Sequence, residues 1–110
     1  MDTTNSRFHV GQSAVLTRTF GNAEVSTFAE LCGDTNPVHL DEEYAKDTPF
    51  GARIAHGWLV SSMFSTLFGT VLPGEGALYL GQTLKFKAPV YLGDTVTARV
   101  ELCHLRSDKP

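Results

Sequence analysis

The stretch GWLVSSMFSTLFG, residues 57–69, decides the fold class of this chain. It carries no charge, and its polar side chains are the hydroxyls of serine and threonine. A helix that is apolar on nearly all sides belongs inside a protein. Because about 20 apolar residues are needed to cross a membrane, this shorter stretch predicts a buried helix of a globular domain instead.

Strands and shorter helices are predicted on both sides of this helix. Residues 14–20 are rich in β-branched side chains and predict a strand, residues 21–33 repeat apolar side chains at helical spacing, and residues 41–47 predict a short helix. Residues 78–90 and 95–106 alternate between apolar and polar side chains, as half-buried strands do. This order predicts an α+β fold in which an antiparallel sheet wraps around the long helix.

Composition excludes several classes of function. The 110 residues carry a net charge of -3 without a cluster of lysine or arginine, so we expect neither nucleic acid nor an anionic membrane as a partner. Cys32 and Cys103 have no metal-ligand set around them, so we predict two thiols and no metal site. The polar start MDTTNSRFHV has no signal-peptide pattern, which predicts cytoplasmic residence.

The loop GDTNPVHLD, residues 33–41, holds the first candidate site residues. Asp34 and His39 are close in sequence, and Pro37 stiffens the backbone between them by fixing its own φ and restricting Asn36. A carboxylate and an imidazole held in this way could bind one water and move its proton. Two simpler interpretations stay open: Asp34 could form only a turn after the helix, and His39 could lie on the surface.

The start of the buried helix holds the second candidate. A helix N-terminus presents free N–H groups, and Gly57 has no Cβ to keep a substrate carbonyl away from its own N–H. That N–H could stabilise an enolate oxygen. Alternatively, Gly57 only relieves crowding, and the preceding His56 is expected to pack or cap more than to catalyse.

The motifs FAELCGDTNPVHLDEEYA (residues 28–45) and GARIAHGWLVSSMFSTLFG (residues 51–69), with the sequence that follows, resemble the MaoC-like (R)-specific enoyl-CoA hydratases of polyhydroxyalkanoate biosynthesis. The resemblance implies the hot-dog fold over residues 10–110, after a polar segment at residues 1–9. It implies a cytoplasmic homodimer in acyl-CoA metabolism that needs no cofactor.

The resemblance also assigns roles to residues. It implies that Asp34 and His39 hold the catalytic water and that the Gly57 N–H polarises the thioester carbonyl. Asn36 would organise the site, and Ser65 and Phe68 would line the acyl pocket, where a bulky Phe68 suggests a short acyl chain. The expected reaction is syn addition of water to a trans-2-enoyl-CoA, which gives the (R)-3-hydroxyacyl-CoA.

The resemblance breaks off at the end of the chain. Family members usually continue past RSDKP, residues 106–110, with two further strands, so we expect a sheet that lacks its last two strands. This leaves two alternatives to the hydratase. One is a non-catalytic subunit that binds acyl thioesters and needs a partner chain, and the other is a dehydratase that acts on 3-hydroxyacyl thioesters of acyl carrier protein.

Overall fold

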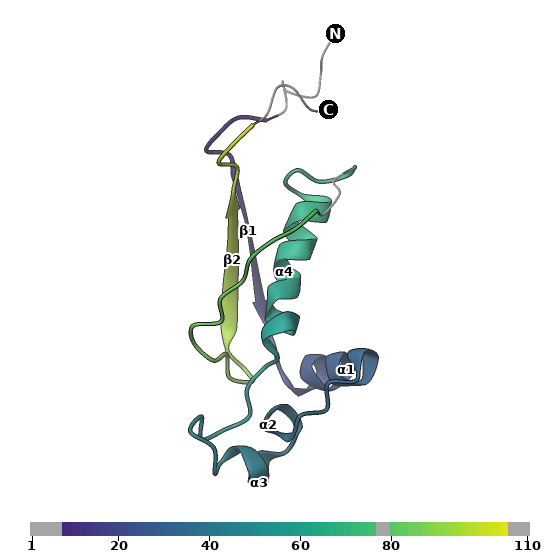
Figure 1. Cartoon of the computed structure of the whole chain (residues 1–110), viewed down its shortest axis with the longest axis vertical. Helices are drawn as coiled ribbons and strands as arrows, with labels where there is room; N and C mark the ends of the chain where they lie inside the picture. Colours follow the sequence, from purple (N-terminus) through teal and green to yellow (C-terminus); the bar gives the residue numbers. More distant parts are fainter. Residues whose placement is uncertain (1–7, 77–79, 106–110) are drawn as a thin grey trace. The chain divides into compact units, whose positions relative to one another are not determined.

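The computed structural model describes residues 8–76 and 80–105 of the chain. Its elements are β1 (Ser13–Thr19), α1 (Asn22–Cys32), α2 (Pro37–Leu40), α3 (Glu42–Ala45), α4 (Gly57–Thr70) and β2 (Thr95–Glu101) (Figure 1). Most of the predicted segment 1–9 and the final RSDKP lie outside the described residues, so the domain boundary at residue 10 stays a prediction. The α+β class, with an antiparallel sheet and one long helix, is confirmed.

The chain divides into two compact units. One contains residues 17–62 and 81–96, and the other contains the rest, including the second half of α4 from Met63 onward. All the contacts that build the candidate site lie within the first of these units.

Helix α1 forms where its local signals predict it. The N–H of Gly21 donates to the Glu24 carboxylate at 2.7 Å, as in a capping box. Gly33 ends the helix with φ of 86°, a left-handed conformation that glycine adopts without strain. Val25 and Ala29 are buried along the predicted apolar face, which places α1 against the rest of its unit.

The loop after α1 contains a helical turn that the sequence analysis did not predict. The side chain of Asn36 accepts from the Val38 N–H at 3.1 Å and so caps α2, and Pro37 occupies the first turn, where its fixed φ suits a helix. His39 therefore lies on α2 and not in an irregular loop. Asp41 ends α2 and caps the predicted short helix α3.

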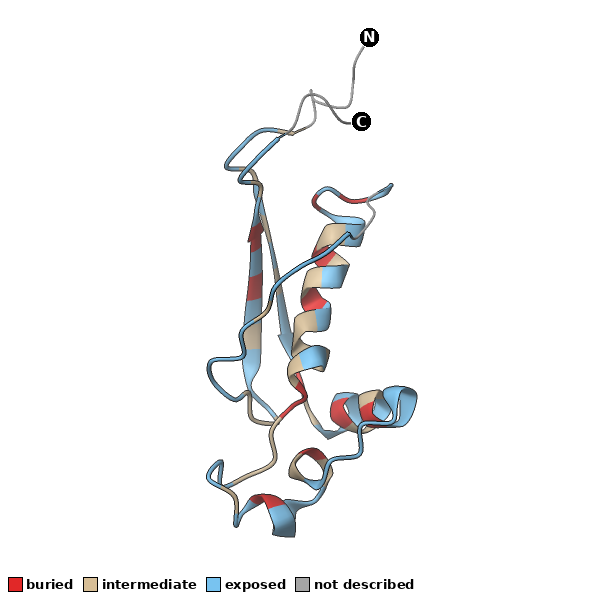
Figure 2. Cartoon of the chain, in the orientation of Figure 1, coloured by how far each residue is buried: buried red, intermediate tan, exposed pale blue. Residues whose placement is uncertain are grey.

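Strands β1 and β2 pair antiparallel. The N–H of Gly11, before β1, donates to the carbonyl of Leu102, after β2, whereas Phe20 at the far end of β1 donates to Asp94. Along β2 the predicted alternation is present, with Ala98 and Val100 buried and the residues between them exposed (Figure 2).

The strand predicted at residues 78–90 is wrong for its described part. Residues 80–90 form no strand, although Lys85 and Lys87 alternate with apolar side chains there. In the part of the chain that the structure describes, the sheet consists of β1 and β2, and residues 80–90 pair with neither. Alternation of side chains alone does not hold a strand.

Helix α4 is long and apolar as predicted, but its burial is narrower than expected. Met63 and Leu67, four residues apart, are buried, whereas Trp58 is 62% exposed. Figure 2 shows this single buried stripe along α4. With two strands in the described sheet, few side chains are available to cover the other sides of the helix. None of the helices in the described residues has the length and apolarity of a membrane span.

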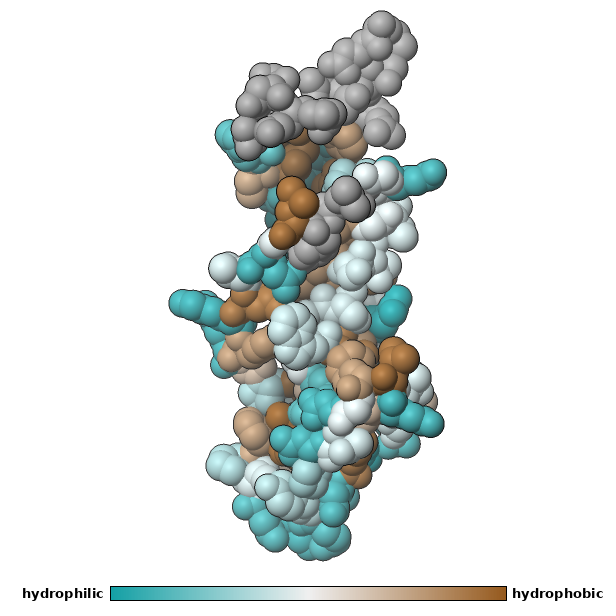
Figure 3. All heavy atoms as spheres, turned by 45° about the vertical axis from the view of Figure 1, so that its right-hand side comes forward, coloured by the Kyte–Doolittle hydropathy of each residue, from teal (hydrophilic) through white to brown (hydrophobic). Residues whose placement is uncertain are grey.

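Large apolar side chains remain on the surface of the described chain. Figure 3 shows apolar surface in brown between hydrophilic patches on the face that it draws. The most exposed are Leu80 at 95% and Leu31 at 83%. Exposed apolar surface of this kind often marks a contact with another molecule.

Candidate active site

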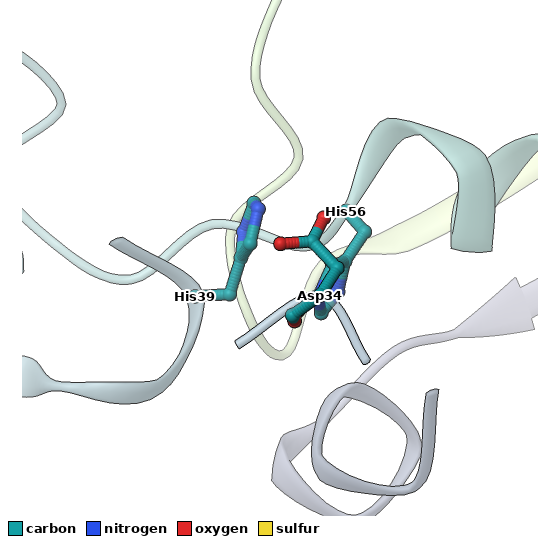
Figure 4. Close-up of side chains that lie close together, drawn as sticks. All are labelled: Asp34, His39 and His56. Atoms are coloured by element: carbon teal, nitrogen blue, oxygen red, sulfur yellow. The ribbon is translucent and has the colours of Figure 1, made fainter. Parts of the chain in front are cut away.

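Three polar side chains from different parts of the sequence meet in one place. The carboxylate of Asp34, the imidazole of His39 and the imidazole of His56 each offer an atom within 4.8 Å of the others. Figure 4 shows the carboxylate of Asp34 facing the ring of His39, with His56 beside them. The spacing of Asp34 and His39 in sequence thus places the two groups together in space.

Asp34 is held by the backbone around it. Its Oδ1 accepts from the N–H of Asn36 at 3.2 Å, which makes the turn that the simpler interpretation expected. A carboxylate accepts several hydrogen bonds, so this turn does not exhaust its acceptors. Asp34 is exposed, and a solvent molecule can reach it.

His39 is held more tightly. It is 9% exposed, and its Nδ1 lies 2.8 Å from the carbonyl of Ile54. Because a carbonyl can only accept, Nδ1 carries the proton, and in the neutral ring Nε2 is then a proton acceptor. The backbone of His39 is fixed too, since Nε of Arg53 donates to its carbonyl at 2.8 Å while Nη2 donates to Asn22 on α1.

His56 lies behind this pair. It is 2% exposed, and its Nε2–H donates to the backbone carbonyl of Asp34 at 3.0 Å. Its ring stacks on the ring of His39 with centroids 3.9 Å apart, and Phe28 meets its ring edge-on at 4.8 Å. The sequence interpretation of His56 as a packing residue agrees with this burial.

Asp34, His39 and His56 are also residue types that bind metals, a combination the sequence analysis did not predict. The ring planes of the two histidines differ by only 29°. The two rings therefore stack on each other, and each offers a nitrogen within 4.8 Å of an Asp34 carboxylate oxygen.

A cavity of about 490 Å³ opens beside His39. Its lining is mostly apolar, as is usual for small-molecule sites. The charged side chains among its lining residues are those of Lys85 and Lys87. The full lining comprises His39, Phe50, Ile54, Ala55, Gly57, Trp58, Val60, Ser61, Lys85, Phe86, Lys87, Ala88, Pro89 and Val90.

Gly57 lines the same cavity at the first residue of α4. The ring of Phe86 approaches it so closely that a Cβ on Gly57 would lie 2.7 Å from ring carbons. Phe86 is 57% exposed and meets Trp58 edge-on at 6.1 Å. A side chain at residue 57 would therefore require the Phe86 ring to move, and this close approach supports the interpretation that Gly57 relieves crowding.

Not every predicted site residue lies at this cavity. His39 and Gly57 are among its lining residues, whereas Asp34, Asn36, Ser65 and Phe68 are not. The contacts of these four residues with a substrate therefore stay a prediction. Trp58 and Ser61 also line the cavity, although neither was a predicted site residue. The sequence signal for a site role of Trp58 was its position directly after Gly57, in the first turn of α4.

Comparisons with known proteins agree with this architecture. The family model for the MaoC-like domain matches residues 5–109. An (R)-specific enoyl-CoA hydratase of Aeromonas caviae is 55% identical over 101 residues, which cover 92% of this chain and 75% of the relative. One of Rhodospirillum rubrum is 52% identical over 99 residues, 90% of this chain and 69% of the relative.

The solved structures give the same result. The structure of an (R)-hydratase from Aeromonas caviae involved in PHA biosynthesis superposes with a TM-score of 0.91 at 54% identity and covers 94% of this chain and 78% of its own. The match of the family model over nearly the whole chain, with such relatives, shows that the chain belongs to the MaoC-like domain family.

Proposed function

We propose that this chain is a hydro-lyase that adds water to a trans-2-enoyl-CoA and gives the (R)-3-hydroxyacyl-CoA. The observation that carries the proposal is the pairing of Asp34 with His39, whose ring lines the cavity. The two named (R)-specific enoyl-CoA hydratases support the direction and stereochemistry of the reaction.

The distance between Asp34 and His39 suits one shared water. Two hydrogen bonds of about 2.8 Å from a single water can join acceptors up to about 5 Å apart. A carboxylate oxygen of Asp34 and a ring nitrogen of His39 lie within 4.8 Å of each other. Because Nδ1 of His39 donates to Ile54, we propose that Nε2 is the nitrogen that accepts from the water. Each group would accept a hydrogen bond from one O–H of the water, which leaves a lone pair of its oxygen free to attack.

The reaction needs only acid–base chemistry at these groups, so we propose that it uses no cofactor. The water oxygen forms a bond to C3 of the enoyl thioester, and the π electrons of the C2–C3 bond move to the thioester oxygen as an enolate. The proton that leaves the water is returned to C2 from the same face. This gives syn addition, in which one C–O and one C–H bond replace the π bond.

Gly57 is the proposed donor to the enolate oxygen. Its N–H lies in the first turn of α4, where helical N–H groups have no partner within the helix. Such a donor contributes typically about 10²–10³-fold to the rate. The ring of Phe86 next to Gly57 would then form one wall of the site that receives the thioester.

The charge at the cavity suits the substrate. The chain has a net charge of -3, yet the lining residues include Lys85 and Lys87 and no carboxylate. We propose that these lysines meet the phosphates of coenzyme A. Their place at the cavity with His39 favours this role. Arg53 is already bonded to His39 and Asn22.

The substrate contacts of Asn36, Ser65 and Phe68 and the homodimer remain part of the proposal. Trp58 at 62% exposure and Phe86 at 57% support a contact with a second molecule, because large aromatic side chains seldom stay exposed without one. Measurement of the mass in solution tests the dimer.

The hydratase is tested with the purified chain and crotonyl-CoA. We expect the enoyl absorbance to fall and the product to be the (R) isomer alone. The same assay on the crotonyl thioester of acyl carrier protein separates the hydratase from the dehydratase alternative. A folded, monodisperse protein that turns over neither thioester would overturn the proposal and favour the non-catalytic subunit.

A further inference from the structure

We infer that His56 is a positioning residue. It holds Asp34 and His39 at the spacing and orientation that their shared water needs, without taking part in proton transfer. The inference rests on the proposed function, because it concerns the same pair of groups. It explains why a polar, ionisable side chain is buried at a place where the reaction needs no third proton carrier.

Among the described residues, the segment 53–56 makes the hydrogen bonds that reach Asp34 and His39 from a distant part of the sequence. Arg53 donates to the carbonyl of His39, and the carbonyl of Ile54 accepts from the His39 ring. His56 donates to the carbonyl of Asp34 across a sequence separation of 22 residues. Two of these contacts fix His39, and the contact from His56 fixes Asp34. Without it, Asp34 keeps only its local turn with Asn36.

The hydrogen bonds define which proton His56 carries. Nε2 must carry a hydrogen, because its partner is a carbonyl. Nδ1 is buried and has no hydrogen-bond partner among the described residues. The bond to the Asp34 carbonyl thus orients the ring, with Nε2 as its donor.

The stacking of the rings gives His56 its second contact with the pair. Phe28 packs edge-on against His56, and His56 in turn stacks on His39. A ring 3.9 Å from the face of His39 blocks rotation of that imidazole, so its Nε2 keeps one direction. If His56 only filled space in the core, an apolar ring at this position would fill it equally well and would not bury an unpaired nitrogen.

Two substitutions separate the hydrogen bond from the packing. His56→Gln retains a side-chain N–H that can donate to the Asp34 carbonyl, whereas His56→Phe retains a ring against His39 and loses the donor. We expect His56→Phe to lower kcat by about 10–100-fold, as misplacement of a reacting group does, with KM changed less than about twofold. We expect His56→Gln to keep at least about a third of the wild-type kcat, since the bond to Asp34 is the dominant contact.

Measurement of ¹⁵N chemical shifts of the histidine rings tests the inference without any assay. We expect the Nε2–H tautomer for His56 and the Nδ1–H tautomer for His39 in the wild-type chain. In His56→Phe we expect His39 to keep its single set of ring signals, because a ring still stacks on it. We expect the backbone signals of Asp34 to shift, because its carbonyl loses the bond from His56. The thermal midpoint of each variant shows whether it is folded at the assay temperature.

Equal kcat values for the two folded variants would overturn the inference, as would unchanged backbone signals of Asp34 in His56→Phe. Failure of the proposed function is a separate result, because it would appear as a wild-type chain without hydratase activity, whatever the ring signals show.

Discussion

The substitution Asp34→Asn separates catalysis from turn formation at the same residue. Asparagine keeps an oxygen that can accept from the Asn36 N–H, the 3.2 Å bond that holds the turn, but it cannot take a proton. Asp34 is exposed, so we expect the free energy of unfolding to change by less than about 0.5 kcal/mol. Loss of general acid–base help is typically about 10²–10⁴-fold in kcat, or roughly 3–5 kcal/mol in the barrier.

Asp41→Asn is the matched control. Asp41 is also exposed, and its Oδ1 accepts from the N–H groups of Glu43 and Tyr44, at 3.0 and 3.2 Å, at the start of α3. Asparagine caps helices about as well as aspartate, so the loss is limited to the interaction of the charge with the helix end, about 0.3–1 kcal/mol. We expect a slightly less stable protein with wild-type kcat.

The assay is the initial rate of crotonyl-CoA hydration, with urea unfolding of each variant as the measure of stability. The two variants should show opposite patterns, with activity lost in Asp34→Asn and some stability lost in Asp41→Asn. If folded Asp34→Asn keeps more than about a third of the wild-type kcat, Asp34 is a turn residue and the reasoning is refuted.

Three further predictions concern the cavity and the core. Replacement of both Lys85 and Lys87 by alanine should raise KM for crotonyl-CoA by about tenfold. The crotonyl thioester of pantetheine lacks the nucleotide phosphates, so its KM should change by less than about twofold. Equal effects on both thioesters would exclude the phosphate contact. Gly57→Ala should lower kcat because the new methyl group meets the Phe86 ring. Adding Phe86→Ala to the same chain should restore kcat. If kcat does not recover, the methyl group blocks the substrate itself. Met63→Ala should lower the free energy of unfolding by about 2–5 kcal/mol, since Met63 is 1% exposed. A loss below about 1 kcal/mol in urea unfolding would contradict this prediction.

The parts of the fold that depend on local signals were predictable from the sequence. Helix α1 begins with the bond between Gly21 and Glu24 and ends at the left-handed Gly33, and each of these signals acts within a few residues. Helix α2 was missed because a cap at Asn36 and a proline at the first position can start a turn that lasts only four residues. Neither residue alone distinguishes such a turn from a loop.

The parts that depend on distant partners were not predictable. Alternation at residues 80–90 suggested a strand, but a strand exists only where another strand completes its hydrogen bonds. At the site, the short spacing of Asp34 and His39 was informative because the same loop carries both. The contact of His56 with Asp34 depends on tertiary folding, so its sequence position predicted burial at most.

A crystal structure of the chain with butyryl-CoA, a saturated thioester that cannot be hydrated, tests the central claim most directly. The account predicts one ordered water within about 3.2 Å of both the Asp34 carboxylate and Nε2 of His39, next to C3 of the acyl group. It also predicts the thioester oxygen within hydrogen-bond distance of the Gly57 N–H. A thioester bound away from His39, or a water that contacts only one of the two groups, would contradict it.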